Sequence, residues 1–408
     1  MSKRTFLFLQ GGTSYFFRRL ADKLISEGHQ VHKINFNGGD RDYWGANPAF
    51  DFRGGLEDLP DYLEHKAHAL GVTDFIVYND RRPVNAPAIT LARKNNLRSH
   101  VYEEGYFRPY FITLERDGVN GNSSLPRDPD WYRTTSKKVP DYPEGKSFSF
   151  GFRSRATTDI AYELANLANP ISFPHYHSHV PYNRWIGYLA HLRRFAKYPR
   201  QIPRDRQLIE ALVSARTPYY CLPLQLESDA QIRHYSSFTS MAQIIEHVMR
   251  SFAAHAPPHT RLVIKNHPHD PGFVNFTRVI SNLTGALSLT GRIDYLETGN
   301  TGLLLQHALG VVTVNSTTGL AAIEMARPTI VLGQAIYNLP GMAFQGSLDT
   351  FWRDGTPPDA ELFRCFRNVV IHGTQVNGGY YTADAIELAV QNSWQRLVAE
   401  KSPLEELL

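Results

Sequence analysis

Two short motifs in the C-terminal half of the chain combine residue types that suit phosphate binding. They are Lys265-Asn266-His267-Pro268 and Asn315-Ser316-Thr317-Thr318-Gly319, and each follows an apolar run typical of a strand. The second motif opens a predicted helix, whose N-terminus presents unpaired N–H groups and a partial positive charge. We expect the Ser316 and Thr317 hydroxyls and the amides near Gly319 to hold a nucleotide phosphate, with His267 donating from the opposite wall. The structural alternative is that Ser316 or Thr317 only caps the helix and Pro268 only ends a strand.

The elements that must position these residues alternate between strand and helix patterns. In the first hundred residues we expect strands at 5–10, 31–36, 74–78 and 99–103 and helices at 15–27 and 86–95. This order predicts a parallel sheet with crossover helices, and ligands of such sheets bind beyond the C-terminal ends of the strands. Six residues fall at or near those ends and are candidates for the catalytic and acceptor side of a site: Gln10, Gly11, Gly12, Asn37, Glu103 and Glu104.

The alternation resumes after residue 203, with strands at 218–224, 261–264, 311–314 and 329–332 and helices at 240–254, 302–308 and 319–326. We therefore predict an α/β fold of the GT-B type, with two Rossmann-like domains facing across a cleft. The expected bounds are 1–200 for an N-terminal acceptor and catalytic domain with an irregular insertion at 105–151, 201–380 for a C-terminal nucleotide-sugar-binding domain, and 381–408 for a helix that packs back on the first domain. With 408 residues, each domain is large enough to bury its own core.

Bulk composition is that of a globular protein with a mild net charge of +4. The two cysteines, Cys221 and Cys365, lack CxxC spacing, so we expect reduced, buried thiols without a catalytic role. The apolar run at 6–9 is far too short for a signal peptide, and no segment approaches the length that crosses a bilayer. We therefore expect a cytoplasmic protein that is not integral to a membrane.

Basic residues concentrate between Arg184 and Arg206, interleaved with aromatic side chains. The cations are Arg193, Arg194, Lys197, Arg200, Arg204 and Arg206, and the aromatic residues are Trp185, Tyr188, Phe195 and Tyr198. Such a stretch can rest on an anionic membrane surface. The alternative is a solvated inter-domain helix whose aromatic side chains face the core. No nucleic-acid-binding motif accompanies the patch, so we expect no nucleic acid partner.

Several runs occur in an order that resembles a known family. They are Phe8-Leu9-Gln10-Gly11, Ile34-Asn35-Phe36-Asn37-Gly38-Gly39-Asp40, Glu103-Glu104-Gly105-Tyr106-Phe107-Arg108-Pro109-Tyr110 and the two phosphate-type motifs. Together they resemble the capsular polysaccharide biosynthesis proteins of the KpsS kind over nearly the whole length. The resemblance implies an enzyme peripheral on the inner face of the inner membrane that transfers 3-deoxy-manno-octulosonic acid (Kdo) from CMP-Kdo with retention of configuration. The implied acceptor is phosphatidylglycerol or its lyso form, and the product begins the β-Kdo linker of a Gram-negative capsule, with other capsule assembly proteins as further partners.

Related linker-extending enzymes carry a Glu-Asp-Gly signature whose central carboxylate is the proposed nucleophile, and the corresponding residue here is Glu104, longer by one methylene. Retention requires two inversions or a front-side attack, and a carboxylate at the anomeric carbon permits the first route. Adjacent strand residues point to opposite faces, so only one of Glu103 and Glu104 faces the site unless the strand has ended. We choose Glu104 because Gly105 lets the backbone turn there. The alternative is that both are solvated and pair with Arg108 or Arg98.

The remaining candidates concern the donor. CMP leaves as a single phosphate ester, so we expect no metal and no other cofactor; Asp40-Arg41-Asp42, Asp128-Pro129-Asp130 and the histidine-rich loop 175–179 are weak metal motifs. Lys265 either adds charge to the phosphate site or is a strand-end surface residue. Gln225 and Glu227 are candidates for sugar or cytidine hydroxyls, Glu324 for the ribose diol, and Arg108 or Arg292 for the Kdo carboxylate.

Two rival functions remain open. One is another CMP- or CDP-activated transferase, sialyltransferase-like or a glycerophosphotransferase, which donor preference would distinguish. The other is a non-catalytic component of capsule export that binds lipid-linked glycan through the basic stretch. The second rival predicts that Glu104 is dispensable whereas Arg193 and Arg194 are not.

Overall fold

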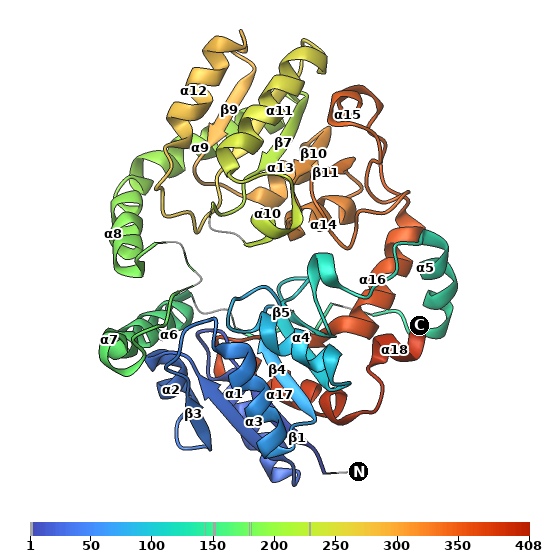
Figure 1. Ribbon diagram of the computed structural model, residues 1–408. Coiled ribbons are helices and arrows are strands. Elements are labelled where there is room, and N and C mark those ends of the chain that lie inside the picture. The colour runs from blue at the N-terminus through green and yellow to red at the C-terminus, as the bar shows by residue number, and fades with distance from the viewer. Residues whose placement is uncertain (1–2, 143, 150–151, 179, 181, 228–229) are drawn as a thin grey trace. The chain divides into compact units, whose positions relative to one another are not determined.

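The computed structural model describes residues 3–142, 144–149, 152–178, 180, 182–227 and 230–408 (Figure 1). The chain divides into two compact units. Unit 1 comprises 1–126, 134–179 and 367–408, and unit 2 comprises 127–133 and 180–366. The domain bounds expected from the sequence are 1–200 and 201–380, so unit 2 also takes in 127–133 and 180–200, and unit 1 takes in 367–380. Each unit has its own sheet and its own buried core.

Unit 1 contains a seven-stranded sheet in the order β12-β6-β5-β4-β1-β2-β3. Its strands are β1 (Thr5–Phe8), β2 (Gln30–Asn35), β3 (Ala49–Asp51), β4 (Asp74–Tyr78), β5 (Arg98–Glu104), β6 (Phe111–Arg116) and β12 (Gln375–Asn377). The strands β3, β2, β1, β4 and β5 are mutually parallel, whereas β6 runs antiparallel to both β5 and β12. The order β3-β2-β1-β4-β5 is the Rossmann order, with a topological switch point between β1 and β4.

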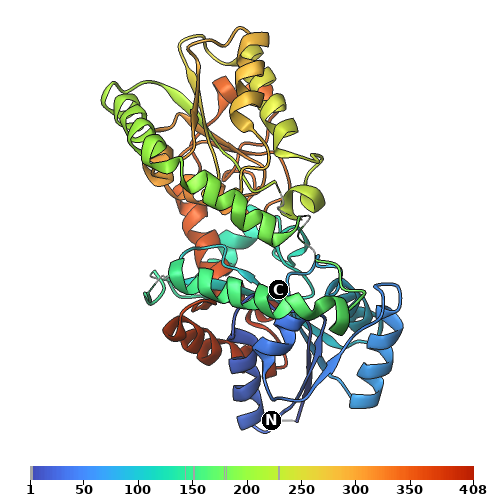
Figure 2. The same ribbon diagram turned by 90° about the vertical axis from the view of Figure 1, so that its left-hand side faces the viewer.

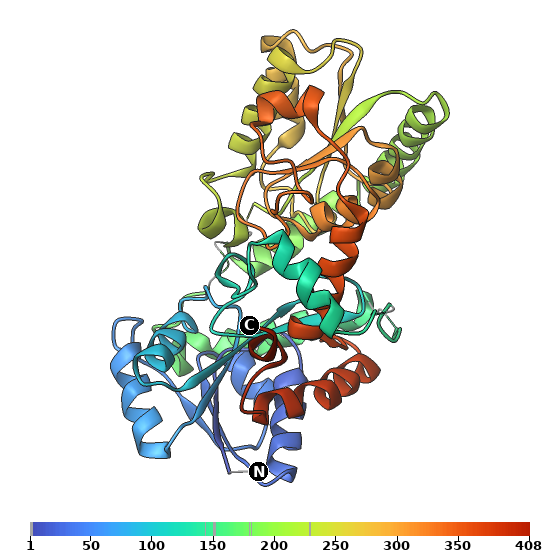
Figure 3. The ribbon, with the colours of Figure 1, turned by 90° about the vertical axis from the view of Figure 1, so that its right-hand side faces the viewer.

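Both faces of this sheet are covered by helices. The helices of unit 1 are α1 (Phe16–Ser26), α2 (Gly38–Trp44), α3 (Leu59–Leu70), α4 (Ala86–Lys94), α6 (Phe152–Ala165), α7 (Asn169–Ser172), α17 (Ala383–Val398) and α18 (Pro403–Leu407). Alternate residues of β1 divide between two cores: Phe6 and Phe8 pack with α1 and α17, and Leu7 packs with α3 and α4. Helix α1 buries one apolar stripe and ends before Gly28, whose φ of +88° suits glycine. The C-terminal helices, red in Figure 3, thus lie beside the N-terminal elements, and α17 contacts α1.

Unit 2 contains a five-stranded parallel sheet in the order β11-β10-β7-β8-β9. Its strands are β7 (Tyr219–Pro223), β8 (Arg261–Lys265), β9 (Ile293–Leu296), β10 (Gly310–Thr313) and β11 (Thr329–Val331). Read from β9, this is again the Rossmann order, and the switch point lies between β7 and β10.

The helices of unit 2 are α8 (Arg184–Phe195), α9 (Tyr198–Ser214), α10 (Ala230–Tyr235), α11 (Met241–His255), α12 (Phe276–Ala286), α13 (Thr301–His307), α14 (Thr317–Glu324) and α15 (Leu348–Asp354). One core packs α11, α12 and α15 against one face of the sheet, and a second packs α9, α13 and α14 against the other. Helices α8 and α9 are light green in Figure 2.

The segment 105–151 is not the irregular insertion that the sequence suggested. It contains the strand β6, the helix α5 (Pro129–Thr135) and two short 3-10 helices, η1 (Asn120–Asn122) and η2 (Ser136–Lys138). A third, η3 (Asn166–Ala168), joins α6 to α7. Helix α16 (Ala360–Thr374) begins in unit 2 and ends in unit 1. The expected α/β class and the parallel strands at the two phosphate-type motifs are confirmed, whereas the cleft between domains stays a prediction.

Candidate active site

The carboxyl ends of the unit 2 strands bring the phosphate-type motifs to one edge of the sheet. Lys265 ends β8 and is 4% exposed, and its Nζ donates to the Asn266 carbonyl at 3.1 Å. Burial lowers the pKa of Lys265. The residue is therefore a buried support beneath the loop, so the alternative of a strand-end surface lysine is wrong. Its contribution to phosphate binding stays a prediction.

His267 is half-buried and is fixed by its neighbours in the same motif. Its backbone N–H donates to Asn266 Oδ1 at 2.8 Å, and its ring Nδ1 accepts from the His269 amide at 3.1 Å. Because Nδ1 accepts, the proton of the neutral ring lies on Nε2. His267 therefore has the tautomer that donates to an anion, which suits the role predicted for it. Pro268 is exposed.

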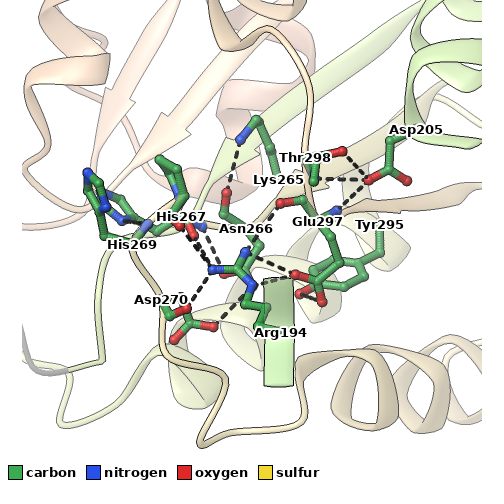
Figure 4. Close-up of polar contacts among 11 residues, drawn as sticks. Arg194, Asp205, Lys265, Asn266, His267, His269, Asp270, Tyr295, Glu297 and Thr298 are labelled. Carbon is green, nitrogen blue, oxygen red and sulfur yellow. Dashed lines mark hydrogen bonds and ion pairs between the residues drawn. The ribbon is translucent and has the colours of Figure 1, made fainter. Parts of the chain in front are cut away.

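A polar network beneath this loop was not anticipated (Figure 4). Arg194 of α8 donates to backbone carbonyls of the loop and to Glu297, which follows β9. Asp205 of α9 accepts from the amides of Glu297 and Thr298 at 3.0 and 2.9 Å. Arg194 and Asp205 are 6% and 1% exposed. The expectation that Arg194 belongs to a solvated basic face is thus wrong, because its side chain is buried and hydrogen-bonded inside unit 2.

The second motif lies at the switch point of unit 2. Ser316 is the N-cap of α14, and its Oγ accepts from the Thr318 amide at 3.1 Å. The capping role is therefore real, and a phosphate at this helix start would meet the amide and hydroxyl of Thr317. Gly319 is buried against Tyr337, whose Oη would lie 2.5 Å from an added Cβ. A glycine is needed here for close packing.

Gln225 and Asn315 join the ends of β7 and β10. Gln225 Nε2 donates to Asn315 Oδ1 at 2.9 Å, and the Asn315 amide donates to Gln225 Oε1 at 3.2 Å. The structure thus brings Gln225 to the second motif. Glu227 instead accepts from the Met241 amide at the start of α11 at 2.9 Å, and Glu324 is exposed at the last residue of α14. The sugar-binding and ribose-binding roles of these two carboxylates stay predictions.

In unit 1 the carboxylate pair lies at the end of β5. The strand continues through Glu104, which pairs with Ile112 of β6, so Glu103 and Glu104 project to opposite faces. Glu103 accepts from Asn79 Nδ2 at 2.6 Å and from the Glu104 amide at 3.0 Å. Burial raises the pKa of Glu103.

Glu104 has different surroundings. Its Oε1 accepts from Tyr381 Oη at 3.1 Å, and the Arg155 guanidinium lies 4.7 Å from the centre of the Tyr381 ring. Burial and the nearby Glu104 charge raise the pKa of Tyr381, so the phenol stays a donor at neutral pH. Tyr381 and Arg155 lie far from Glu104 in the sequence, and only the fold associates them with it.

The other unit 1 candidates lie at the ends of β1 and β2. Gln10 Nε2 donates to Tyr176 Oη at 3.1 Å, and Arg82 donates to the Gly11 carbonyl at 2.6 Å. An added Cβ at Gly12 would lie 3.8 Å from the Tyr78 ring, which is ordinary contact. Asn37 is fully buried and caps α2 by accepting from the Asp40 amide at 2.8 Å. Asn37 therefore has a structural task whether or not it meets a ligand.

Two expectations about arginines need correction. Arg98 lies at the beginning of β5 and donates to the Ala399 carbonyl, so it is not the partner of Glu103 or Glu104. Arg292 precedes β9 at the amino edge of the unit 2 sheet, where its Nε donates to the Thr260 carbonyl at 3.1 Å. It therefore lies at the wrong edge to bind a sugar carboxylate. Arg108 is exposed, and its Nε donates to the Gly105 carbonyl at 3.4 Å.

Metal ligands and thiols are the other groups with catalytic potential. Within the described part of the chain, no group of three or more His, Cys, Asp or Glu side chains is arranged to hold a metal ion. His175 and His177 are exposed, and His179 lies outside the described residues. Cys221 and Cys365 are free and buried, as predicted, and burial raises the pKa of Cys221 to about 12. Such a thiol is a poor nucleophile.

Comparison with known proteins places the chain in a family. The sequence pattern of the family described as capsule polysaccharide biosynthesis protein matches residues 73–381. The chain belongs to this family. It is 36% identical over 392 residues to the capsule polysaccharide modification protein LipB of Neisseria meningitidis serogroup B, covering 93% of this chain and 92% of LipB. It is 34% identical over 384 residues to the capsule polysaccharide export protein KpsS of Escherichia coli, covering 93% and 98% of the two chains.

Two solved structures with similar folds share little sequence with this chain. The β-Kdo 2,7 transferase of KpsC from Thermosulfurimonas dismutans aligns with 12% identity and a TM-score of 0.41, covering 89% of each chain. The fold assignment rests on the strand order of the chain's own two sheets. Among the described residues, no helix is both long and apolar enough to cross a membrane.

Proposed function

We propose that this chain is a retaining glycosyltransferase that moves Kdo from CMP-Kdo to phosphatidylglycerol or its lyso form and so begins the β-Kdo linker of a capsule. The observation that carries the proposal is Glu104, a half-buried carboxylate at the carboxyl end of a parallel strand with the Tyr381 hydroxyl on one oxygen. Membership of the capsule polysaccharide biosynthesis family supports the pathway. The phosphate-type edge of unit 2 supports a nucleotide-activated donor.

On the donor side, the leaving group is a phosphate ester that gains negative charge as its bond to the sugar breaks. His267 Nε2–H and the N-terminus of α14 are groups that stabilise such charge. Gln225 and Asn315 hold the ends of β7 and β10 together, which fixes the start of α14 relative to the sheet. We assign donor binding to this edge.

The transfer takes two displacements. In the first, a Glu104 oxygen attacks the anomeric carbon of Kdo while the bond from that carbon to the phosphate oxygen breaks, and its electron pair leaves with CMP. In the second, the acceptor hydroxyl attacks the same carbon, the bond to Glu104 breaks with its electron pair returning to the carboxylate, and the hydroxyl proton passes to solvent water. Two inversions give net retention. Tyr381, by donating to Glu104, makes the carboxylate a better leaving group in the second step.

The lipid acceptor requires contact with a membrane surface, and α8 has the composition for it. Four of its apolar side chains, Trp185, Ile186, Leu189 and Leu192, are 38%, 57%, 62% and 63% exposed. Residues 184–204 contain no acidic residue, and their cations include Arg193, Lys197 and Arg200. An exposed apolar stripe flanked by cations suits the interface of an anionic bilayer. We therefore propose that the outer face of α8 rests on anionic lipid.

Two experiments test these assignments. Purified protein incubated with CMP-Kdo and a fluorescent lysophosphatidylglycerol should add one Kdo by mass, and Glu104→Gln should abolish the product. Transfer from a different CMP- or CDP-activated donor would favour the rival transferase, and a folded protein inactive with every donor would favour the export role. For the membrane surface, the double substitution Leu189→Ser and Leu192→Ser should reduce sedimentation with phosphatidylglycerol vesicles, whereas Ile25→Ser on α1 should not.

A further inference from the structure

We propose that Arg194 is a positioning residue that holds the loop 266–270 in the conformation that presents His267 to the donor phosphate. The loop geometry is a property of the chain alone, and only the reference to the donor rests on the proposed function. The sequence gives no role to this arginine beyond membership of a basic stretch.

Arg194 makes an unusual set of contacts with a single loop. Its Nη1 donates to the carbonyls of His267, Pro268 and Asp270 at 3.1, 3.1 and 2.5 Å. Its Nη2 donates to the Glu297 carbonyl at 3.3 Å and to Glu297 Oε2 at 3.1 Å. One guanidinium therefore connects the loop after β8 with the end of β9 (Figure 4).

The charge of this buried guanidinium is compensated. Glu297 Oε2 also accepts from Asn266 Nδ2 at 3.0 Å, and Glu297 Oε1 accepts from Tyr295 Oη at 3.0 Å. The Glu297 backbone is in turn held by Asp205. A buried ion pair held by these hydrogen bonds fixes geometry, because removing one partner leaves the other charged and unpaired.

The consequence for His267 follows from the backbone. The imidazole is oriented by contacts within the loop, through the His269 amide on Nδ1 and Asn266 Oδ1 on the His267 amide. Arg194 fixes the loop carbonyls on both sides of the His267-Pro268 bond and does not donate to the ring itself. It therefore sets the place of the ring indirectly, through the chain that carries it.

Helix α8 thus uses two faces for two purposes. Its buried residues are Gly187 and Arg194, which are seven residues apart and so lie on one face. The exposed Trp185, Leu189 and Leu192 follow the spacing of a different face. The clamp on the loop is therefore separable by mutation from the surface that we assign to lipid.

Geometry also explains why arginine is used here. A guanidinium has five N–H donors in a planar fork, whereas a lysine ammonium has three donors at one point. Arg194→Lys keeps the charge that Glu297 requires but cannot reach the loop carbonyls and Glu297 together. We expect Arg194→Met to release the loop and Arg194→Lys to restore it in part.

The test measures hydrogen exchange in the ligand-free protein and, separately, the affinity for CMP by calorimetry. In Arg194→Met, exchange at the His267, His269 and Asp270 amides should quicken about tenfold or more, and CMP affinity should fall about tenfold. Arg194→Lys should lie between this variant and the native protein. The matched control is Arg250→Met, because Arg250 is an exposed arginine of α11 paired with Glu246.

The outcomes separate the two ideas. Native exchange at those amides in Arg194→Met would overturn the clamp. Faster exchange with unchanged CMP affinity would overturn the link to donor binding. If even the native protein fails to bind CMP while exchange responds as stated, the clamp stands and the proposed donor fails. Should Arg194→Met not fold, Arg194→Lys and Glu297→Gln supply the same comparison.

Discussion

The two sheets share one strand order but end their strands in different chemistry. In unit 1 the order β3-β2-β1-β4-β5 brings two carboxylates, Glu103 and Glu104, to the carboxyl edge. In unit 2 the order β9-β8-β7-β10-β11 brings His267 and the N-terminus of α14 to the equivalent edge. One edge thus presents carboxylates, and the other presents a histidine and the N–H groups of a helix start. The strand order decides where a site lies, and the residues that follow each strand decide what it does.

The edges also differ in how their polar groups are held. In unit 2 the buried Arg194, together with Glu297, holds the loop after β8, and Asp205 holds the backbone of Glu297. In unit 1 Glu104 is restrained by a neutral hydroxyl of Tyr381, with Arg155 one step further away. A nucleophile needs an oxygen that can leave its partner, whereas a phosphate-binding loop needs fixed donors. The difference in restraint matches the difference in proposed task.

The largest expected loss of activity follows from a change at the unit 1 edge. Glu104→Gln should lower Kdo transfer about a thousandfold or more while leaving the fold intact, because an amide cannot form the glycosyl ester. Glu103→Gln is the matched control and should lose much less activity. Transfer would be measured with the lipid acceptor by mass. If Glu103→Gln is the inactive variant and Glu104→Gln is not, the two carboxylates exchange roles.

The next largest loss of activity follows from a change at the unit 2 edge. His267→Gln should lower kcat about a hundredfold, because the leaving phosphate loses a donor that acts as charge develops. His259, an exposed histidine that precedes β8, supplies the control His259→Gln. Steady-state kinetics with CMP-Kdo would separate kcat from KM. Equal activity of the two variants would remove His267 from the mechanism.

A smaller effect concerns the packing at the start of α14. Gly319→Ala should destabilise unit 2 by about 1–3 kcal/mol, because the new methyl group would meet Tyr337 Oη at 2.5 Å and Thr313 Cγ2 at 2.7 Å. At Gly285 in α12 an added Cβ meets nothing within 4 Å, so Gly285→Ala should stabilise by up to about 1 kcal/mol. Thermal unfolding measures both. A Gly319→Ala protein as stable as the native one would show that this contact relaxes at no cost.

The smallest expected effect is a difference in how protein stability depends on pH at the two edges. Burial raises the pKa of Glu103 above its usual 4.5, so the stability this group contributes is present below about pH 4.5 and is lost as pH rises through the folded pKa. Burial lowers the pKa of Lys265 below its usual 10.5, so its contribution is present above about pH 10.5 and is lost as pH falls through the folded pKa.

The two neutral variants should therefore respond to pH in opposite senses. Relative to the native protein, the Tm of Glu103→Gln should rise as pH increases, and that of Lys265→Met should rise as pH decreases. Each tenfold difference in proton affinity between the folded and unfolded chains corresponds to about 1.4 kcal/mol of stability. Parallel changes in the two variants would contradict the assignment of burial as the common cause.

The sequence predicts the repeated strands of both sheets well, because buried parallel strands are continuous apolar runs that end in recognisable turns. The strands it misses are short or irregular in pattern: β3 and β12 have three residues each, and Ile293–Leu296 alternates buried with half-buried positions. Strand β6 is concealed in a segment rich in polar residues. Its partners, β5 and β12, come from before and far after it in the chain.

The sequence predicts those site residues that directly follow a strand. It does not predict a residue such as Arg194, which comes from a helix and packs beneath a loop. His267, Ser316 and Glu104 are visible because they follow apolar runs. Arg194 is not, since it stands beside Arg193 in a stretch of cations, and composition does not distinguish them. Its seven-residue spacing from Gly187, opposite the exposed stripe, is the one signal that would have separated it. Tyr381 and Arg155 gave no signal, because only tertiary structure brings them to Glu104.

The division of unit 1 among three segments of the chain has a consequence for synthesis. Strand β12 completes the edge of the sheet against β6, and α17 covers the α1 face, yet both belong to the last 42 residues, 367–408. A chain emerging from the ribosome exposes the apolar side of α1 and an unpaired edge of β6 until its final residues appear. We therefore expect unit 1, whose N-terminal strands are synthesised first, to complete its folding last. Deletion of a short C-terminal segment should destabilise unit 1, which contains the N-terminal strands. It should destabilise unit 2 less, although unit 2 immediately precedes that segment in the chain.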